Sequence, residues 1–463
     1  MKTEKAETKK NRQISRLEKI AAKPQIGGLF VFLMVLLVIV YIVDEVTSNM
    51  TSTMQPYAIY DLFKIPGADA RTEEYTSAVS LMTLISMPAY AFALLLPFYK
   101  SLADKIGRKP MMIINTFGMA LGMFLCMVST HYIVFILGTL IIQFMQPNDI
   151  QVIFIMETAP AKHRAKLCSI AKSIALVSVS LIGVLRSIFY NPEELTSWRM
   201  VYLVPVILAV AAALICIPLV KETPVFVRKR LDYLNGVAVE EKEEKPEEKK
   251  KGGFVTAVKY IFHSKQLRSI ALVGFIFFLS TSITSYYTTI LEAAGSAGTI
   301  TNSQIDKIII FYPFINGLVT FFSGFFSDSL GRKKSSIVLG AIASAGLFMF
   351  VLGSRYGWNE YIIGGGYGMF IGGLWSVSDI LLIMLPAESC PTEIRSSVIG
   401  VMSLVAALGA VATPLMAFLM DAVGTEIIGL VFLCISLPFM LAAIVILSVK
   451  VKETKGVDLD SIQ

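Results

Sequence analysis

Long apolar runs alternate with short polar segments along nearly the whole chain. A bilayer needs about 20 consecutive apolar residues for one helical crossing, so each run predicts a membrane-spanning helix. We expect about twelve spans, which cover residues 28–50, 77–98, 110–130, 132–157, 167–190, 199–220, 268–291, 305–326, 335–353, 360–386, 396–420 and 426–449.

Composition agrees with this pattern. Hydrophobic residues make up 55% of the 463 positions and charged residues only 16%, and the mean hydropathy is +0.68. A chain this apolar has too much hydrophobic surface to bury in one water-soluble core. We therefore predict an all-α integral membrane protein with twelve transmembrane helices.

Two short polar motifs occur twice, once in each half of the chain. ADKIGRKP at 103–110 returns as SDSLGRKK at 327–334, and ETAPAKHR at 157–164 returns as ESCPTEIR at 388–395. The similar offsets indicate an internal duplication into two pseudo-symmetric six-helix halves. Such duplicated bundles are typical of secondary transporters, with the solute site between the halves. The expected parts are a leading tail (1–26), a first half (27–221), a linker (222–267), a second half (268–449) and a closing tail (450–463).

Basic residues predict the orientation of the chain. Most of the 41 Lys and Arg residues lie in the tails, the linker and the loops that carry the repeated motifs, and basic loops are typically cytoplasmic. We expect a multi-pass protein of the plasma membrane with both termini cytoplasmic. The net charge of +7 is then a signal of orientation in the lipid bilayer, and no nucleic-acid partner is expected.

Residue types that carry metal or catalytic chemistry are scarce. The five cysteines show no C-x-x-C spacing, and the three histidines have no ligand partner nearby in the sequence. No catalytic triad, phosphate-binding loop or redox motif occurs. We expect no metal, no cofactor and no enzymatic activity.

The repeated D-x-x-G-R-K motif suggests a conformational latch. An Asp at the end of one span, a Gly turn and a basic cluster can pair with neighbouring charges in one conformation and release them in another. Positive-inside topology could explain one copy, but two copies in corresponding positions favour a shared function.

These motifs resemble those of the major facilitator superfamily, and in particular of its sugar porters. Similar segments are KETPVFVRKR (221–230) after the sixth span, KETKGVDLDSI (452–462) in the closing tail and YYTTILEAAG (286–295) at the end of the seventh span. The resemblance implies the major facilitator fold and transport by alternating access. It also implies a cytoplasmic gate formed by Asp104, Gly107, Arg108, Glu157, Arg164, Asp328, Gly331, Arg332, Glu388 and Arg395.

Several sugar-binding positions of that family carry other residues here. Lys172 stands where sugar porters have a Gln, Ile276 and Phe277 replace a Gln pair, and Ile383 replaces a Trp. Lys172 favours an anionic solute group, unless it snorkels to the interface. The glycine-rich run at 364–373 is expected to serve close helix packing. The candidate solute-binding residues are Asp149, Lys172, Ser282, Tyr286, Tyr287, Asn316, Trp375 and Asp379.

Two acidic residues in the first span are candidates for energy coupling. An ionisable group in hydrocarbon is costly unless it faces a partner or a wet cavity. Asp44 lies where proton-coupled sugar porters have an Asp, and Glu45 is adjacent. The resemblance thus implies a proton-coupling role, and a structural ion pair is the alternative.

The resulting hypothesis is a monomeric secondary active transporter that uses the proton gradient. Its solute would be a small polar organic molecule, either a sugar derivative or an organic acid, carried by proton symport. Drug or metabolite efflux by proton antiport is one alternative. A non-transporting solute sensor on the same fold is another.

Overall fold

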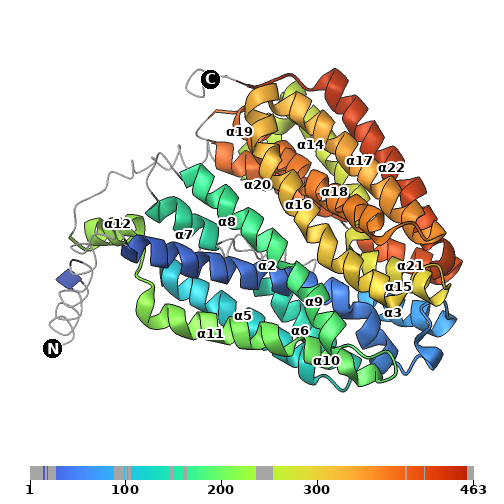
Figure 1. Ribbon diagram of the computed structural model, residues 1–463. Helices are drawn as coiled ribbons and strands as arrows, with labels where there is room; N and C mark the ends of the chain where they lie inside the picture. The colour runs from blue at the N-terminus through green and yellow to red at the C-terminus, as the bar shows by residue number, and fades with distance from the viewer. Residues whose placement is uncertain are drawn as a thin grey trace.

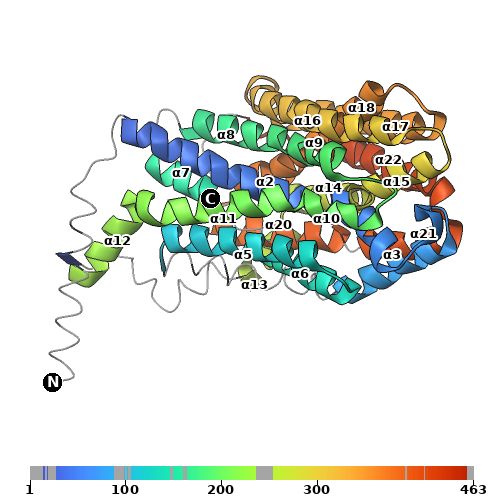
Figure 2. The same cartoon turned by 60° about the horizontal axis from the view of Figure 1, so that its bottom comes forward.

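The computed structural model shows a bundle of helices in two groups (Figures 1 and 2). It describes residues 28–87, 106–145, 150–159, 164–235, 254–391, 394–410 and 412–455, together with residues 14, 15, 18, 99 and 102.

The described helices of the first half lie between residues 28 and 219. They are α2 (Gly28–Leu62), α3 (Glu73–Ser86), α5 (Arg108–Val128), α6 (Tyr132–Met145), α7 (Ile150–Thr158), α8 (Arg164–Ser178), α9 (Ser180–Phe189), α10 (Trp198–Val201) and α11 (Leu203–Leu219), with the short turns η1 (Pro66–Ala68) and η4 (Leu195–Ser197).

Two further helices belong to the expected linker, and the rest form the second half. The linker helices are α12 (Pro224–Asn235) and α13 (Phe254–His263). The second half consists of α14 (Lys265–Phe278), η5 (Leu279–Ser285), α15 (Tyr287–Ser296), α16 (Asn302–Leu330), α17 (Arg332–Tyr356), α18 (Glu360–Asp379), η6 (Ile380–Met384), α19 (Leu385–Ala387), α20 (Arg395–Ala410), α21 (Ala412–Val423) and α22 (Thr425–Lys450).

These helices follow the predicted spans closely. Within the described residues, ten helical segments are long and apolar enough to cross a membrane, and they coincide with ten of the expected spans. The eleventh span is represented by two shorter apolar helices, Ser397–Ala406 and Thr413–Val423. The second span begins with α3 and leads into residues outside the described part.

Some predicted boundaries were wrong. The first helix runs to Leu62 instead of ending at residue 50, because the residues after Met50 still present a buried face to the bundle, with Met54, Tyr57 and Ala58 almost fully covered. The seventh span is broken, since the tighter turns of η5 separate α14 from α15. The linker is partly helical, because 254–263 contains an amphipathic helix that precedes the apolar run.

Glycines allow the helices of the second half to approach closely. A Cβ added at Gly368 would lie 2.5 Å from the Tyr312 carbonyl oxygen of α16, and one at Gly373 would lie 2.6 Å from the Leu339 carbonyl oxygen of α17. Small residues permit this approach in membrane bundles. The packing role predicted for the glycine-rich run is therefore confirmed.

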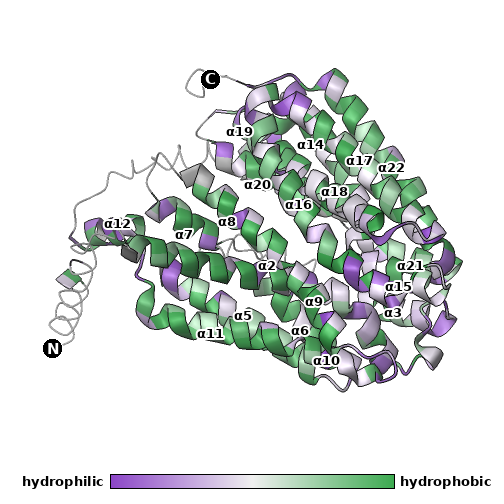
Figure 3. Ribbon diagram, viewed as in Figure 1, coloured by the Kyte–Doolittle hydropathy of each residue, from purple (hydrophilic) through white to green (hydrophobic). Residues whose placement is uncertain are grey.

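The outer surface of the bundle is apolar along the length of the helices. Large side chains such as Ile207, Leu415 and Val445 are more than half exposed, and hydrophilic residues are concentrated toward the ends of the bundle in Figure 3. An apolar belt between polar ends is the surface that a bilayer requires.

The halves meet tightly at one end of the bundle, where α3 packs on α21 and α15 packs on α2. We call this the closed end, and it includes Glu292 and Thr425. The opposite end carries Gly107 and Gly331 of the repeated motifs, and we call it the motif end. In Figure 1 the two groups of helices diverge toward the motif end, with α7 and α8 on one side and α19 and α20 on the other.

Candidate functional site

A cavity of about 450 Å³ lies between the two halves. Its wall combines α2, α6 and α8 of the first half with η5, α16 and α18 of the second. Hydrogen-bonding groups from both halves suit a small polar solute. The hydroxyl and amide side chains in the wall are Ser48, Asn49, Thr51, Ser52, Gln55, Gln143, Thr284, Ser285, Asn316, Thr320 and Tyr367.

Three charged side chains are among the described residues of this wall: Glu45, Lys172 and Asp379. Lys172 Nζ donates to Asp379 Oδ2 at 3.2 Å, so the pair joins α8 of one half to α18 of the other. Both side chains remain partly exposed, at 36% and 46%. Lys172 thus lines the cavity but is paired with a carboxylate of the protein, whereas the sequence suggested that it receives an anionic group of the solute.

Trp375 and Asn316, two further candidate solute-binding residues, also line the cavity. Trp375 lies four residues before Asp379 on α18, so the two side chains share a face of the helix. A π-helical turn, η6, follows Asp379 directly. Such turns are rare and often occur at functional sites.

Asp44 lies behind this wall. Its side chain is buried, and Gln151 Nε2 of α7 donates to Asp44 Oδ2 at 2.6 Å. The neighbouring Glu45 lines the cavity. The two candidate proton carriers therefore differ in surroundings. Asp44 contacts α7 of its own half, whereas Glu45 faces the cavity.

The predicted residues of the seventh span sit deeper than the cavity wall. Tyr287 Oη lies 2.6 Å from the Thr53 hydroxyl of the first half, and Tyr286 donates to the Thr413 carbonyl oxygen at 3.2 Å. Tyr286 lines a side pocket of about 290 Å³ that shares residues with the main cavity, including Ser285. Ser282 is buried, and its hydroxyl donates to the Leu279 carbonyl oxygen at 3.5 Å.

A buried ionic cluster joins the halves at the closed end. Arg186 of α9 is 1% exposed and forms ion pairs with Asp306 of α16 and, at 3.3 Å, with Glu292 of α15. Arg186 Nε donates to Tyr57 Oη at 2.7 Å, and Tyr57 donates to Glu292 Oε1 at 2.5 Å. Tyr60 adds a bond to Glu292 Oε2 at 3.4 Å. Buried charges are tolerated only when paired and hydrogen-bonded, so this cluster seals the closed end.

Other polar contacts between the halves surround this cluster. Tyr75 Oη lies 3.2 Å from the Thr289 hydroxyl, and the Thr76 hydroxyl donates to Asp421 at 3.0 Å. Thr425 donates to the Ala70 carbonyl oxygen at 2.6 Å. The closed end is therefore held by contacts spread over α2, α3 and α9 on one side and α15, α16, α21 and α22 on the other.

The repeated motifs form a network at the motif end of the first half. Arg108 Nη2 of α5 pairs with Glu157 of α7 at 3.0 Å. The Thr223 hydroxyl donates to the other Glu157 oxygen at 2.5 Å, and Glu222 accepts the backbone N–H of Arg108 at 3.0 Å and of Lys109 at 3.2 Å. Residues after the sixth span thus tie the two motifs together.

The second half repeats this network. Arg332 pairs with Glu388 at 3.0 Å and with Asp328 at 3.2 Å, and Thr454 donates to Glu388 at 2.5 Å. Glu453 accepts the backbone N–H of Arg332 at 2.8 Å. The sequence KET occurs at 221–223 and again at 452–454, so a third repeated motif completes the network, and its repetition could have been recognised in the sequence.

The two KET glutamates differ in their electrostatic balance. Burial raises the pKa of the Glu222 carboxyl above its usual value, although three backbone N–H groups oppose this. Burial acts in the same direction on Glu453, but four backbone N–H groups outweigh it and hold the pKa of that carboxyl below its usual value. Hydrogen bonds to the ionised form decide the direction.

Comparison with known proteins identifies the family. Residues 26–414 match the family model described as Major Facilitator Superfamily. The chain belongs to this superfamily. It is 26% identical over 391 residues to the "Glucose transporter GlcP" of Staphylococcus epidermidis. The aligned region covers 78% of this chain and 83% of that protein.

Solved structures of the superfamily show the same fold. The xylose transporter XylE from E. coli, in an inward open conformation, has a TM-score of 0.65 at 15% identity and covers 94% of this chain and 99% of its own. A D-xylose-proton symporter has a TM-score of 0.65 at 14% identity, and the match covers 92% of this chain and 99% of the symporter chain. The predicted twelve-helix major facilitator fold and the resemblance to sugar porters are confirmed. The protein is therefore a multi-pass membrane transporter and not an enzyme.

The remaining predicted gate residues are only partly described. Asp104 lies outside the described residues, as does the side chain of Arg164, whose backbone begins α8. Asp149, a candidate solute-binding residue, also lies outside them. Arg395 begins α20 and hydrogen-bonds to Cys390. In this conformation Arg108 and Arg332 pair within their own halves. The predicted latch would change its pairing in a conformation with a sealed motif end, and this change stays a prediction.

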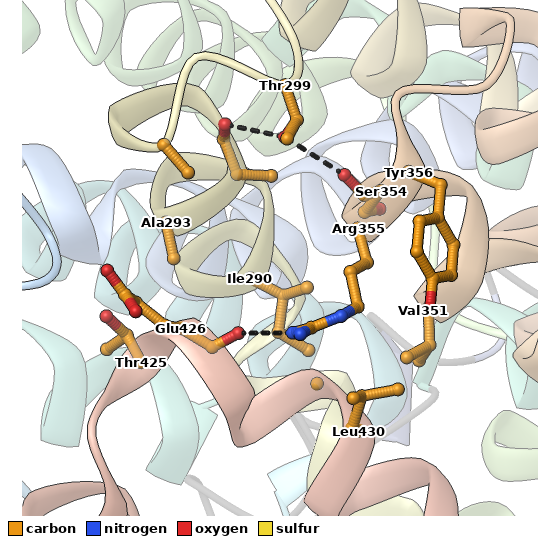
Figure 4. Close-up of a pocket in the computed structure, with 13 residues that line it drawn as sticks. Ile290, Ala293, Thr299, Val351, Ser354, Arg355, Tyr356, Thr425, Glu426 and Leu430 are labelled. Atoms are coloured by element: carbon orange, nitrogen blue, oxygen red, sulfur yellow. Dashed lines mark hydrogen bonds between the residues drawn. The ribbon is translucent and has the colours of Figure 1, made fainter.

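A second cavity of about 340 Å³ lies at the closed end of the second half, between α15, α17 and α22 (Figure 4). Arg355 donates to the Glu426 carbonyl oxygen there at 3.0 Å, and the Thr299 hydroxyl donates to the Ser354 carbonyl oxygen at 3.2 Å. Its described lining comes from one half alone. Alternating access opens a site between halves, so the cavity around Glu45 is the better candidate for the solute.

Proposed function

We propose that this transporter takes up a small hydroxyl-rich solute of the sugar-derivative class together with a proton, by alternating access. The observation that carries the proposal is the cavity between the halves, whose wall is dominated by hydroxyl and amide groups. The names of the glucose transporter GlcP and of the D-xylose-proton symporter support the same solute class and proton coupling. The polar wall disfavours export of apolar drugs.

The proposed orientation places the motif end in the cytoplasm. The basic motif loops support this, because Lys and Arg are enriched in cytoplasmic loops. Both termini would then be cytoplasmic in the plasma membrane, and the conformation with a sealed closed end would face inward. The protein would act as a monomer, since each chain holds a complete cavity between its own halves.

Uptake into proteoliposomes tests the solute class and its energy source. We expect glucose or one of its derivatives to accumulate inside vesicles when an inward proton gradient is imposed, and to exchange without a gradient. Export of the solute from the vesicles under the inward proton gradient, without any accumulation inside, would support efflux. Binding without any flux would support a sensor.

Proton coupling is proposed to reside on Asp44. Asp44→Asn keeps the side-chain shape and a hydrogen bond to Gln151, but it cannot alternate between charged and neutral forms. We expect gradient-driven accumulation to fall by more than about tenfold while solute exchange persists, because exchange needs no net proton transfer. Asp232→Asn on α12, outside the spans, is the matched control and should leave accumulation intact. Full accumulation by Asp44→Asn would move the role to Glu45.

A further inference from the structure

The main cavity and the side pocket share a set of polar residues, which we call the junction: Thr51, Gln55, Gln143 and Ser285. Thr51 and Gln55 belong to α2, Gln143 belongs to α6, and Ser285 ends η5 of the second half. A solute bound at the junction therefore contacts both halves, as expected for a site whose access alternates between the two ends of the bundle.

Several hydroxyl groups of the main cavity already serve the protein as donors. The Ser48 hydroxyl donates to the Asp44 carbonyl oxygen at 2.6 Å, and the Thr284 hydroxyl donates to the Thr281 carbonyl oxygen at 2.7 Å. A hydroxyl has one hydrogen to donate, so these groups can only accept hydrogen bonds from a solute. They make the wall polar, but they offer a solute only half of their hydrogen-bonding capacity.

The amide groups at the junction are not used in this way. Elsewhere in the described wall, Asn49 donates to a carbonyl oxygen of its own helix at 2.8 Å, and Asn316 Oδ1 accepts from the Thr320 hydroxyl at 3.4 Å. The side chains of Gln55 and Gln143 form no hydrogen bond within the part of the chain that the structure describes. Each therefore has both its carbonyl oxygen and its NH2 group available to a solute.

Thr51 adds another unpaired group at the junction. Its hydroxyl oxygen is buried and has no hydrogen-bond partner among the described residues. Buried polar groups are normally paired, so an unpaired one needs an explanation. A hydroxyl group of a solute at the junction would supply the missing partner.

A pair of amides is suited to neighbouring hydroxyl groups. A carboxamide accepts at its oxygen and donates at its NH2 group, and a hydroxyl can both donate and accept. Because α2 and α6 pack against each other and both amides line the same two cavities, Gln55 and Gln143 reach one small region of a solute and not its opposite ends. Amides are neutral, so they discriminate by the positions of hydroxyl groups and not by the charge of the solute.

We propose that Gln55 and Gln143 bind two hydroxyl groups on adjacent carbons of the solute and thereby determine its specificity. The rest of the sugar ring lies toward the side pocket, where Met82, Phe135 and Tyr286 provide apolar surface for its C–H groups. This inference rests on the proposed function, because it assumes a solute rich in hydroxyl groups. It adds the arrangement of hydroxyls that is recognised and the residues that recognise it.

Deoxy sugars test the proposal in the parent protein. Binding of glucose and of the deoxyglucoses that each lack one hydroxyl group is measured by calorimetry on the purified transporter. Loss of one hydrogen bond between neutral groups corresponds to an affinity loss of roughly 2- to 10-fold. We expect the largest losses for the two analogues that lack hydroxyl groups on adjacent ring carbons.

Variants without the amides assign each hydroxyl group to a residue. Gln55→Leu and Gln143→Leu keep a side chain of similar size but cannot form hydrogen bonds. Each should weaken glucose binding by about 3- to 10-fold. Each should weaken binding of one deoxy analogue, a different one for each variant, by less than about twofold, because that analogue has already lost the same hydrogen bond.

Asn302→Leu is the matched control. It replaces an exposed amide at the start of α16, which is not part of the described lining of either cavity. All affinities should remain at the parent values in this variant.

The parent series is decisive even if a variant does not fold. The proposal is overturned, while the proposed function stands, if the two most damaging deletions lie on carbons that are not adjacent or if no analogue binds more weakly than glucose. Unchanged glucose affinity in both Gln variants, or equal losses for every sugar, would also overturn it. If neither glucose nor any analogue binds, the hydroxyl-rich solute class itself is wrong, and the inference fails with it.

Discussion

Replacing Arg186 by Met is expected to open the closed end and to abolish most transport. Arg186 is 1% exposed and is the cation that faces Glu292 and Asp306 across the interface between the halves. Removing one partner of a buried ion pair costs about 3–5 kcal/mol, because the remaining charges stay buried without compensation. Separation of the halves would return both carboxylates to water, so the substitution should shift the population toward that state.

A cysteine reporter measures this shift. Thr289 is buried against Tyr75 at the closed end, and Thr289→Cys in a variant without the five native cysteines should react with a membrane-impermeant maleimide only when this end opens. We expect Arg186→Met to raise the labelling rate on the order of 100-fold.

Charge arithmetic supplies the controls for Arg186. Glu292→Gln leaves Arg186 paired with Asp306, one charge against one, so its effect on labelling should be much smaller. Arg186→Met combined with Glu292→Gln and Asp306→Asn leaves no charge in the cluster, and labelling should fall back toward the parent rate. A larger effect of Glu292→Gln than of Arg186→Met would contradict the assigned role of the cluster.

The sequence indicated the members of the motif-end networks, although not their pairing within each half. Arg108 with Glu157, and Arg332 with Glu388, were singled out because their motifs recur in both halves, and the structure pairs each of them. Repetition works as a signal because a duplicated fold places corresponding residues in corresponding surroundings. The same signal was available for KET at 221–223 and 452–454.

The closed-end cluster was not predictable in the same way. Arg186 lies 120 and 106 positions from its partners Asp306 and Glu292, and no repeat connects them. Glu292 was also assigned to a loop, because the predicted seventh span ended one residue before it. In the structure α15 continues to Ser296 and includes Glu292. A carboxylate assigned to a loop needs no partner, and the need for one is what draws attention to a buried charge.

The cavity wall was partly predictable. Asn316, Trp375, Lys172 and Asp379 were expected to contact solute and do line the cavity, whereas Tyr287 is held behind it by Thr53. Sequence indicates which helix carries a polar group. The break at η5 rotates the end of the seventh span, and only the structure shows which of its side chains then face the solute.

Replacing Gly331 by Ala is expected to destabilise the protein by about 1–3 kcal/mol, because its backbone lies in a region that other residues rarely adopt. Gly331 has φ 92° and ψ 168°, and an added Cβ would lie 2.6 Å from Glu453 Oε2. Gly107 has φ 110° and ψ 159°, and a Cβ added there would lie even closer to Glu222 Oε2. Both glycines leave room for the carboxylate that accepts the next backbone N–H groups, so Gly107→Ala should have a similar cost.

Thermal unfolding of the purified protein measures these costs, and Gly324→Ala is the matched control. Gly324 lies within α16 and has no atom within 4 Å of an added Cβ, so its replacement should be neutral or stabilising by up to about 1 kcal/mol. Glu453→Ala removes the carboxylate that a Cβ at Gly331 would meet, and it also removes the acceptor of the Arg332 and Lys333 backbone N–H groups. Gly331→Ala should therefore cost less in that background than in the parent, by roughly 0.5 kcal/mol or more for residues in contact. Strictly additive effects would show that backbone strain alone requires the glycine, and that the space for Glu453 does not.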